Sequence, residues 1–305
     1  CWYHCNSITA TDLSELFEQL KGFTPEQEFE NKPTEFNPNK SFWAGSFAYD
    51  MVQWTQPISL QNLPKEGELL AVLWLIDKYI SQSKNTDDFQ IFSKNDDWKN
   101  LVQSVIQNNP AKIELPIQPA NVFDESCSLT DEQHAELIEE IKLGISEGQV
   151  YQVNFGRFWS GQLIESPQVI FNRLLASNPA PFSTMIYAED LGFSLISSSP
   201  ESLLKSQNGE IYTSPIKGTY ESSRDPIEAE KLRDLMSKDV KERSEHRMLV
   251  DLMRNDLSAV CQVGSVEIER FDIETYSNVQ HLVSHLKGRL LDSENGMTAF
   301  NSIFP

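Results

Sequence analysis

The dipeptide Asn208-Gly209 constrains the fold of this chain more than any other short feature. Both central residues of a type I′ turn need a positive φ, and Asn-Gly meets that need with little strain. On either side of the dipeptide lie the apolar-containing runs 203–206 and 211–214. The sequence therefore predicts an antiparallel hairpin that pairs these two runs.

The same register brings two ionisable residues to one end of the ladder. Glu201 falls opposite Ile216, so that Glu201 and Lys217 become neighbours. Strict alternation would direct their side chains to opposite faces, but Pro200 and Pro215 have no backbone donor and end regular pairing there, which leaves the facing open. A carboxylate beside an amine in a partly buried site suits proton transfer or nucleophilic chemistry. The alternative is a surface ion pair at a sheet edge.

A long helix is predicted over 239–257, because apolar residues recur there at helical intervals with no Gly or Pro between them. At about 100° per residue, one face of this helix collects five side chains, namely Glu242, Glu245, Leu249, Leu252 and Asp256. Carboxylates on an apolar face need partners, because burying an unpaired charge is costly. Two explanations stay open at this point: ion pairs with arginines of the same helix, or a bound metal.

The charge balance bears on the class of partner. The chain has 45 acidic and 25 basic residues, a net charge of −20, which argues against a surface for nucleic acid or anionic membrane. A small anionic substrate in a locally basic site stays compatible with this balance. The four cysteines lack the spacing of a zinc site and are interpreted as free thiols of a reducing compartment. With no apolar run of roughly 18 residues and no recognisable signal peptide, the sequence predicts a cytoplasmic protein.

The order of the elements predicts the fold class. Strands joined by short turns, with helices between groups of strands, indicate an α+β chain with large antiparallel sheets. The run 69–80 is almost continuously apolar and predicts a strand buried on both faces, and helices are predicted over 95–107 and after the capping box at 130–133. The segment 108–128 holds three prolines without periodicity and is the best candidate for a linker.

Four ordered motifs give the chain a resemblance to a known family. They are Ser-Ser-Pro-Glu at 198–201, Pro-Ile-Lys-Gly-Thr at 215–219, a segment beginning Lys-Glu-Arg-Ser-Glu-His at 241–257, and Val-Gln-His-Leu-Val-Ser at 279–284. With Tyr-Gln-Val-Asn at 151–154, they resemble the motifs of the chorismate-utilising enzymes, most closely those of the aminodeoxychorismate synthase component I group.

The resemblance implies an architecture. It implies two facing, largely antiparallel sheets flanked by helices, with an N-terminal component I region at 1–118 and a chorismate-binding catalytic region at 119–305. Residues 295–305 resemble the segment that precedes the Gly-Gly-Ser-x-Thr-Gly loop of these enzymes, so the sandwich is expected to be incomplete at the C-terminus. The family's second magnesium-ligating Glu would then be missing from these 305 residues, which leaves their activity in isolation open.

The resemblance also implies roles for residues at the matching positions. The expected functional residues are catalytic Lys217, Glu201 and His281, substrate-binding Gly218 and Thr219, and the Mg²⁺ ligand Glu245. A strand histidine satisfied by a backbone carbonyl is the structural alternative for His281.

The activity that the resemblance implies is the conversion of chorismate and ammonia to 4-amino-4-deoxychorismate, on the way to 4-aminobenzoate and folate. Ammonia would come from glutamine through a partner glutamine amidotransferase subunit in a heterodimer. Two alternatives stay open. One is a sibling enzyme, either anthranilate synthase component I, which resembles Pro-Ile-Ala-Gly-Thr where this chain has Lys217, or an isochorismate-forming enzyme. The other is an inactive remnant that only binds the amidotransferase.

Overall fold

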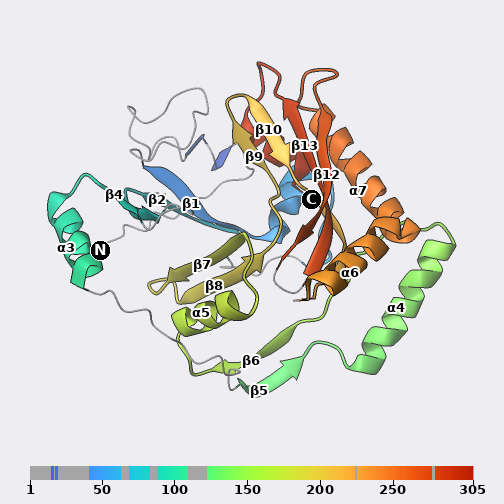
Figure 1. Cartoon of the computed structure of the whole chain (residues 1–305), viewed down its shortest axis with the longest axis horizontal. Helices are drawn as coiled ribbons and strands as arrows, with labels where there is room; N and C mark the ends of the chain where they lie inside the picture. The colour runs from blue at the N-terminus through green and yellow to red at the C-terminus, as the bar shows by residue number, and fades with distance from the viewer. Residues whose placement is uncertain are drawn as a thin grey trace. The chain divides into compact units, whose positions relative to one another are not determined.

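The computed structural model describes residues 15–16, 18–19, 41–62, 69–82, 88–108, 122–223, 225–276 and 279–304 (Figure 1). These residues form helices and several sheets, and every strand pair with a defined register is antiparallel, which confirms the predicted α+β class. Two compact units divide the chain: one takes 1–113, 180–182 and 199–305, and the other takes 114–179 and 183–198. The predicted boundary between 118 and 119 lies outside the described residues and stays a prediction.

The largest sheet belongs to the first unit and is built around one long strand, β13 (Val279–Arg289). Along one edge β13 pairs with β12 (Glu267–Thr275). Along its other edge it pairs in succession with β10 (Glu210–Thr213) and β11 (Ile216–Glu221). A fifth strand, β9 (Lys205–Gln207), extends the sheet beyond β10. Because β13 has neighbours on both edges, it lies in the interior of the sheet.

The predicted hairpin is confirmed in both turn and register. Asn208 and Gly209 have φ of 55° and 77°, as a type I′ turn requires. Ile211 pairs with Ser206 and Tyr212 with Lys205, the register that the sequence predicts. The ladder is shorter than expected at its open end, because regular pairing stops at Lys205.

Two helices cover one face of this sheet: α6 (Pro226–Lys238) and α7 (Val240–Ser258). Asp225 and Asp239 act as N-caps, since their carboxylates accept backbone N–H groups of the first turns. Side chains that alternate along β13 point toward the helices, so that Leu282 packs on Met236 of α6. The predicted helix over 239–257 therefore exists and lies against the sheet.

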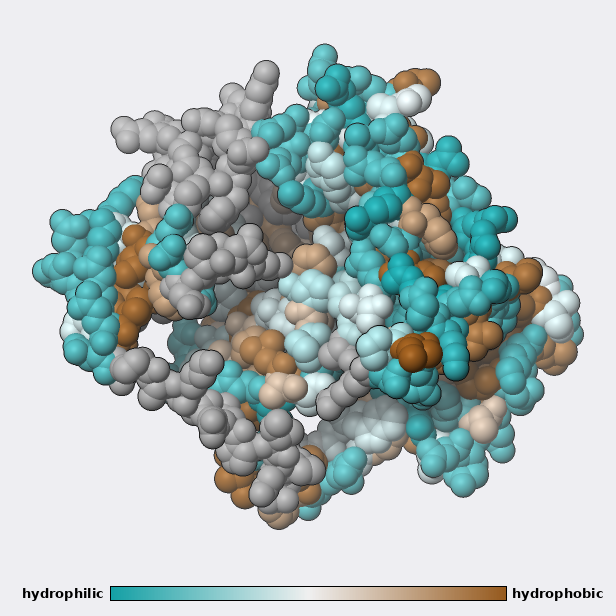
Figure 2. Space-filling view, viewed as in Figure 1, coloured by the Kyte–Doolittle hydropathy of each residue, from teal (hydrophilic) through white to brown (hydrophobic). Residues whose placement is uncertain are grey.

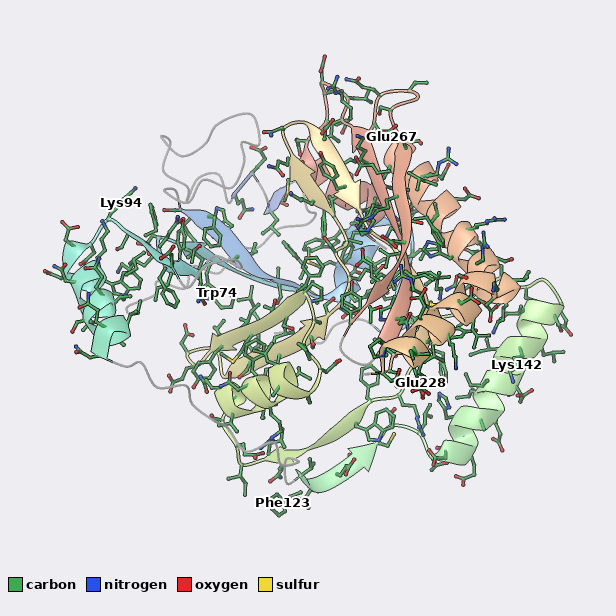
Figure 3. All side chains as sticks on the ribbon, viewed as in Figure 1. Trp74, Lys94, Phe123, Lys142, Glu228 and Glu267 are labelled. Carbon is green, nitrogen blue, oxygen red and sulfur yellow. The ribbon has the colours of Figure 1, made fainter. Side chains whose placement is uncertain are left out.

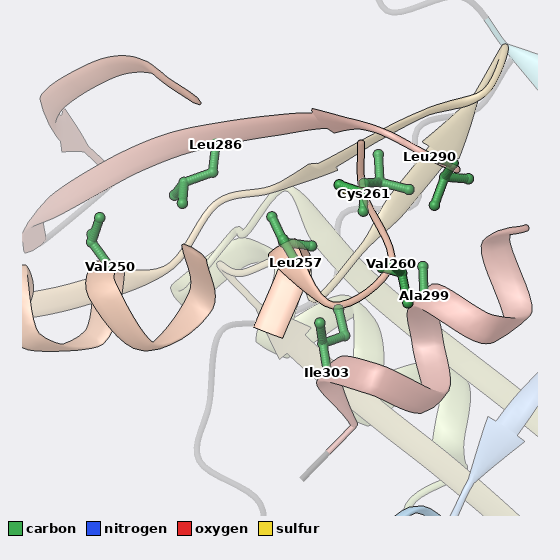
Figure 4. Close-up of a cluster of buried hydrophobic side chains, with 9 residues drawn as sticks. Val250, Leu257, Val260, Cys261, Leu286, Leu290, Ala299 and Ile303 are labelled. Atoms are coloured by element: carbon green, nitrogen blue, oxygen red, sulfur yellow. The ribbon is translucent and has the colours of Figure 1, made fainter. Parts of the chain in front are cut away.

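A second helix contact completes the main core. Figure 4 shows side chains of α7, β13 and α8 (Gly296–Ile303) converging in one apolar cluster. Its buried members are Ile211, Val250, Leu257, Val260, Cys261, Leu286, Leu290, Ala299 and Ile303. Close packing of this kind supplies most of the stability of a helix laid on a sheet.

The buried face of α7 differs from the predicted one. Its buried residues are His246, Val250 and Leu257, whereas Leu252 is 42% exposed. Glu245 lies on the flank, about 100° around the helix from His246. The predicted face left His246 out, while the structure buries that imidazole against Ser284.

The rest of the first unit consists of short paired strands and helices. They are β1 (Phe42–Phe47) with β2 (Ala71–Ile76), β3 (Lys78–Gln82) with β4 (Phe89–Ser93), η2 (Tyr49–Met51), α2 (Val52–Thr55) and α3 (Asp96–Asn108). The single buried strand predicted over 69–80 is wrong, because Asp77 separates β2 from β3 and β2 is only half-buried throughout. The helix predicted over 95–107 is confirmed, and Figure 2 shows its hydrophilic outer surface beside a band of apolar side chains.

The second unit holds six elements with little buried surface of their own. They are β5 (Val122–Cys127) with β6 (Trp159–Leu163), α4 (Asp131–Ser146), α5 (Pro167–Ser177), and β7 (Phe182–Ala188) with β8 (Phe193–Ser199). The predicted capping box is confirmed, since the side chains of Thr130 and Gln133 bond each other's backbone N–H. Phe123 is 49% exposed, and in Figure 3 its ring points away from the strand pair.

Two predictions made from the composition can also be compared with the structure. In the described part of the chain, no helix combines the length and the hydropathy needed to cross a membrane. Cys127 and Cys261 are free cysteines, as predicted, while Cys1 and Cys5 lie outside the described residues.

The orientation of α7 can be tested with one pair of leucines. Leu257→Ala should lower the free energy of unfolding by about 2–5 kcal/mol, because the side chain is fully buried and its loss leaves a cavity. Leu252→Ala, on the same helix, should change it by less than about 1 kcal/mol, because that side chain faces solvent. Urea unfolding of both variants measures the difference, and equal losses would contradict the observed helix orientation.

Candidate active site

The candidate site lies at the edge of the main sheet, just beyond the point where the pairing of β9 with β10 ends. The backbone N–H of Ile216 donates to Glu201 Oε1 across 2.9 Å. Ser284 N–H donates to Pro215 O, so alternation turns the N–H of Ile216 away from β13 and toward the outer edge. Because β9 begins only at Lys205, none of the described strands pairs with that edge at Ile216. The Glu201 carboxylate therefore takes the place of the missing strand carbonyl.

The surroundings of Glu201 favour a carboxyl group that can exchange a proton. Glu201 as a residue is exposed, but partial loss of solvation at its carboxylate raises the pKa of Glu201 above its usual value. The hydrogen bond from Ile216 and the neighbouring His281 and Lys217 act in the opposite direction but do not cancel the effect. The net upward shift brings the protonated form closer to neutral pH, which suits a group that both accepts and returns a proton.

Lys217 lies at the same end of the ladder as Glu201, as the sequence predicts. In the register of β11 and β13 it stands opposite Leu282, immediately before the register shift. Its side chain is half-buried, and in the part of the chain that the structure describes its amine makes neither a hydrogen bond nor an ion pair. The surface ion pair between Glu201 and Lys217 is therefore not formed, although the two groups are close enough for their charges to interact.

Gly218 interrupts the strand immediately after Lys217. The register of β11 with β13 shifts between Lys217 and Thr219, and the inserted glycine has φ of 76°. This is the geometry of a bulge whose first residue is a left-handed glycine. A Cβ at Gly218 would lie 2.9 Å from Glu242 Oε2 and 3.2 Å from Met236 Cε, so both the backbone and the neighbours require glycine.

Thr219 and His281 meet on the other side of the bulge. They form a cross-strand pair, and His281 Nδ1 lies 3.1 Å from Thr219 Oγ1 and 3.2 Å from Gly218 O. A carbonyl oxygen only accepts, so the hydrogen bond to Gly218 requires the proton of a neutral imidazole to be on Nδ1. His281 Nε2 is then the acceptor. The predicted structural alternative, a histidine bonded to a backbone carbonyl, is thus realised in a way that leaves one nitrogen for chemistry.

Glu245 is not brought into contact with this group. Its side chain is 40% exposed on the flank of α7, and its closest cation is Lys241 Nζ at 3.8 Å. Among the described residues, no cluster of three or more carboxylate, His or Cys side chains could hold a metal. Mg²⁺ commonly binds one or two carboxylates and keeps waters and substrate oxygens as its other ligands. Glu245 alone would supply one such ligand, and its role in binding Mg²⁺ stays a prediction.

Two groups near the site were not identified from the sequence. Tyr276 packs its ring on His281, with centroids 5.5 Å apart, and donates from its hydroxyl to Glu274 at 2.9 Å. His246 is buried behind the sheet with Nε2 2.7 Å from Ser284 Oγ. The spacing of His246 with Val250 and Leu257 follows helical intervals and could have identified it, whereas Tyr276 is placed by the pairing of β12 with β13.

Comparisons with known proteins identify the family to which this site belongs. Residues 2–305 match the sequence profile of a family described as chorismate binding enzyme. The chain is 33% identical over 234 residues to aminodeoxychorismate synthase component 1 of Bacillus subtilis, which covers 76% of this chain and 48% of that protein. It is 30% identical over 315 residues to anthranilate synthase component 1 of Aquifex aeolicus, which covers 97% of this chain and 62% of that protein. The chain thus spans roughly half the length of these curated relatives.

Solved structures show the same fold. Anthranilate synthase component I from Streptococcus pneumoniae TIGR4 aligns with a TM-score of 0.76 at 23% identity, over 95% of this chain and 66% of that one. The menaquinone-specific isochorismate synthase from Escherichia coli aligns with a TM-score of 0.63 at 17% identity, over 97% of this chain and 63% of that one. At these identities the likeness concerns the fold alone.

The bulge glycine can be tested against a second glycine with the same backbone conformation. Gly218→Ala should lower the free energy of unfolding by about 2–3 kcal/mol, because it adds a clash with Glu242 to the strain of a positive φ. Gly264→Ala, where φ is 78° and the added Cβ meets nothing within 4 Å, should cost only about 1 kcal/mol. Urea unfolding measures both, and equal costs would show that the contact with Glu242 does not constrain the bulge.

His246 should make stability depend on pH. Burial lowers the pKa of His246 in the folded protein, so the unfolded chain binds the extra proton first as pH falls. The stabilisation is therefore complete above the unfolded value of about 6.5 and is lost as pH falls below it, toward the lower folded pKa.

The measurement compares His246→Gln with the unchanged protein, so that the titration of other groups cancels. The difference in unfolding free energy between the two should shrink from pH 7.5 to pH 5. A difference that stays constant over this range would show that His246 is not buried in its neutral form.

Proposed function

The chain belongs to the chorismate binding enzymes, and on that premise we propose that the protein containing it makes 4-amino-4-deoxychorismate from chorismate and ammonia. The observation that carries the proposal is the half-buried amine of Lys217, which has no hydrogen-bond or ion-pair partner among the described residues and lies near the Glu201 carboxyl. An amine held near a proton acceptor, without an ion pair to hold it charged, is suited to act as a nucleophile.

Lys217 forms the first new bond in this proposal. Glu201 accepts a proton from the lysine, and the neutral amine attacks C2 of chorismate. Both ring double bonds shift, the bond from C4 to its hydroxyl breaks, and Glu201 returns the proton so that water leaves. Ammonia then attacks C4, both double bonds shift back, and the bond between C2 and the lysine nitrogen breaks. The lysine leaves as a neutral amine and takes back a proton from the new C4 ammonium group. One difficult substitution becomes two easier ones, and Lys217 and Glu201 are free for the next cycle.

The neighbouring residues would orient the substrate and the departing hydroxyl. His281 offers Nε2, because Nδ1 is engaged by Gly218 and Thr219. That nitrogen can accept a hydrogen bond from the C4 hydroxyl and hold it in line for departure. Gly218 and Thr219 form the bulge beside this position, so we assign them to contact with the substrate.

A magnesium ion and a partner subunit complete the proposal. Chorismate-utilising enzymes generally use Mg²⁺. Held by Glu245, the ion would supply positive charge that neutralises a substrate carboxylate. A glutamine amidotransferase is proposed as the source of ammonia, in the cytoplasm, with the product directed to 4-aminobenzoate and folate.

Anthranilate synthesis is the second candidate function. It is favoured by the Aquifex aeolicus relative, named anthranilate synthase component 1, which aligns over 97% of this chain. In that reaction ammonia itself would add at C2, so no lysine nucleophile is needed. Lys217 therefore decides between the two candidates, since the resemblance to anthranilate synthases implies alanine at its position.

The deciding variant is Lys217→Ala in the protein that contains this chain. Without the amine, ammonia meets C2 directly, so the product should change from the 4-amino to the 2-amino isomer, with at least about a hundredfold loss of 4-amino product. Chromatography of reactions fed with chorismate and ammonium measures both isomers. Intact-mass spectrometry of quenched, unchanged protein should show a covalent adduct that the variant lacks.

Lys205→Ala on β9 provides the matched control, because it removes a lysine of the same sheet that lies over the ring of Tyr212. It should leave both the product and the adduct unchanged. If the unchanged protein forms mainly the 2-amino isomer and no adduct, anthranilate synthesis replaces the present proposal.

A further inference from the structure

Tyr276 and Glu274 form a hydrogen-bonded pair beside His281 that the proposed chemistry does not use. Glu274 stands directly opposite His281 in the ladder of β12 and β13, so the two side chains share one face of the sheet. Tyr276 follows the last residue of β12, and its backbone N–H donates to Val279 O at 2.8 Å. The backbone that carries Glu274 and Tyr276 is therefore held against β13.

The imidazole of His281 contacts both the bulge and the ring of Tyr276. Gly218 O and Thr219 Oγ1 engage the Nδ1 edge of His281. The ring of Tyr276 packs on the same imidazole with centroids 5.5 Å apart and planes tilted by 53°. The hydrogen bond at Nδ1 alone would let the imidazole of His281 rotate about that contact. The Tyr276 ring packed against the imidazole prevents this rotation. Together the two contacts fix the direction in which Nε2 points.

The tyrosine is itself held in place through its hydroxyl. Tyr276 Oη donates to Glu274 Oε2 at 2.9 Å, while Glu274 Oε1 lies 2.9 Å from His285 Nε2 and 3.4 Å from the Arg270 guanidinium. Burial first, and then the bond to Glu274, raise the pKa of Tyr276 to about 12. The hydroxyl therefore keeps its proton and donates to Glu274 throughout the neutral range.

We propose that Tyr276 is a positioning residue, which, anchored by Glu274, fixes the imidazole of His281 as the Nδ1–H tautomer with Nε2 directed toward the substrate. The role of that nitrogen rests on the proposed function, but the orientation of the imidazole does not. The orientation of the imidazole should affect the chemical step rather than substrate binding, because neither Tyr276 nor Glu274 needs to contact the substrate.

The test uses Tyr276→Phe, which keeps the ring and removes the anchoring hydroxyl, and Glu274→Gln, which keeps the shape and removes the charge. In both variants kcat should fall by about tenfold to a hundredfold with KM changed less than about twofold, because a misdirected group slows the reaction more than it weakens binding. Glu267→Gln is the matched control. Glu267 sits at the far end of β12, pairs with Lys287 and should alter neither constant (Figure 3).

A spectroscopic readout separates positioning from general stability. Nitrogen-15 NMR of the five histidines, with His281 assigned by its absence in His281→Gln, should show Nδ1–H in the unchanged protein. In Tyr276→Phe and Glu274→Gln a fraction of Nε2–H should appear while the urea midpoint changes little. If both variants keep the Nδ1–H form and normal kcat, Tyr276 does not position His281.

The same spectra distinguish a failure of this proposal from a failure of the proposed function. The tautomer is measured in the free protein and needs no turnover. If Lys217→Ala leaves the product unchanged but the tautomer still depends on Tyr276, the positioning role stands and the reaction assignment is wrong.

Discussion

The burial of polar side chains on β13 is the constraint on which the rest of the structure depends. Gln280, His281 and Ser284 are each at most 9% exposed on a strand that is paired along both edges. A buried polar group without a partner costs about 1–3 kcal/mol, so each of these residues needs a partner from another element. Gln280 donates to a carbonyl of α6, and Ser284 meets His246 of α7. The helices are therefore held in register by polar contacts as well as by the apolar core.

The candidate site depends on the same need for a hydrogen-bond partner, here for His281 on the other face of β13. His281 finds its partners at Gly218 and Thr219 only because the bulge turns their oxygen atoms toward it. The bulge exists because Gly218 tolerates a positive φ where Glu242 and Met236 leave no room for a side chain. A local irregularity of one residue thus places a lysine, a threonine and a histidine around one point of the sheet.

The charges around the candidate site differ from the net charge of the whole chain. The net charge of −20 gives no hint of an anionic substrate. Around Glu201, however, Lys217 and His281 both act to lower the pKa of that carboxyl. The local balance arises because the hairpin edge ends at Lys205 and leaves a backbone donor for Glu201 to bind. Overall composition is therefore a poor guide to the site, because a few residues set the local field.

Sequence alone determined the elements whose cause is local. The φ preference of Asn208-Gly209 fixed the hairpin register, and with it the meeting of Glu201 and Lys217, because both turn residues must adopt positive φ. Uninterrupted helical periodicity likewise predicted α7. Tertiary structure decided which face of α7 is buried and that Tyr276 lies on His281, because burial of His246 and contact across strands depend on partners far apart in the chain. Periodicity gives the spacing of side chains along an element, but the element packed against it selects the face that is buried.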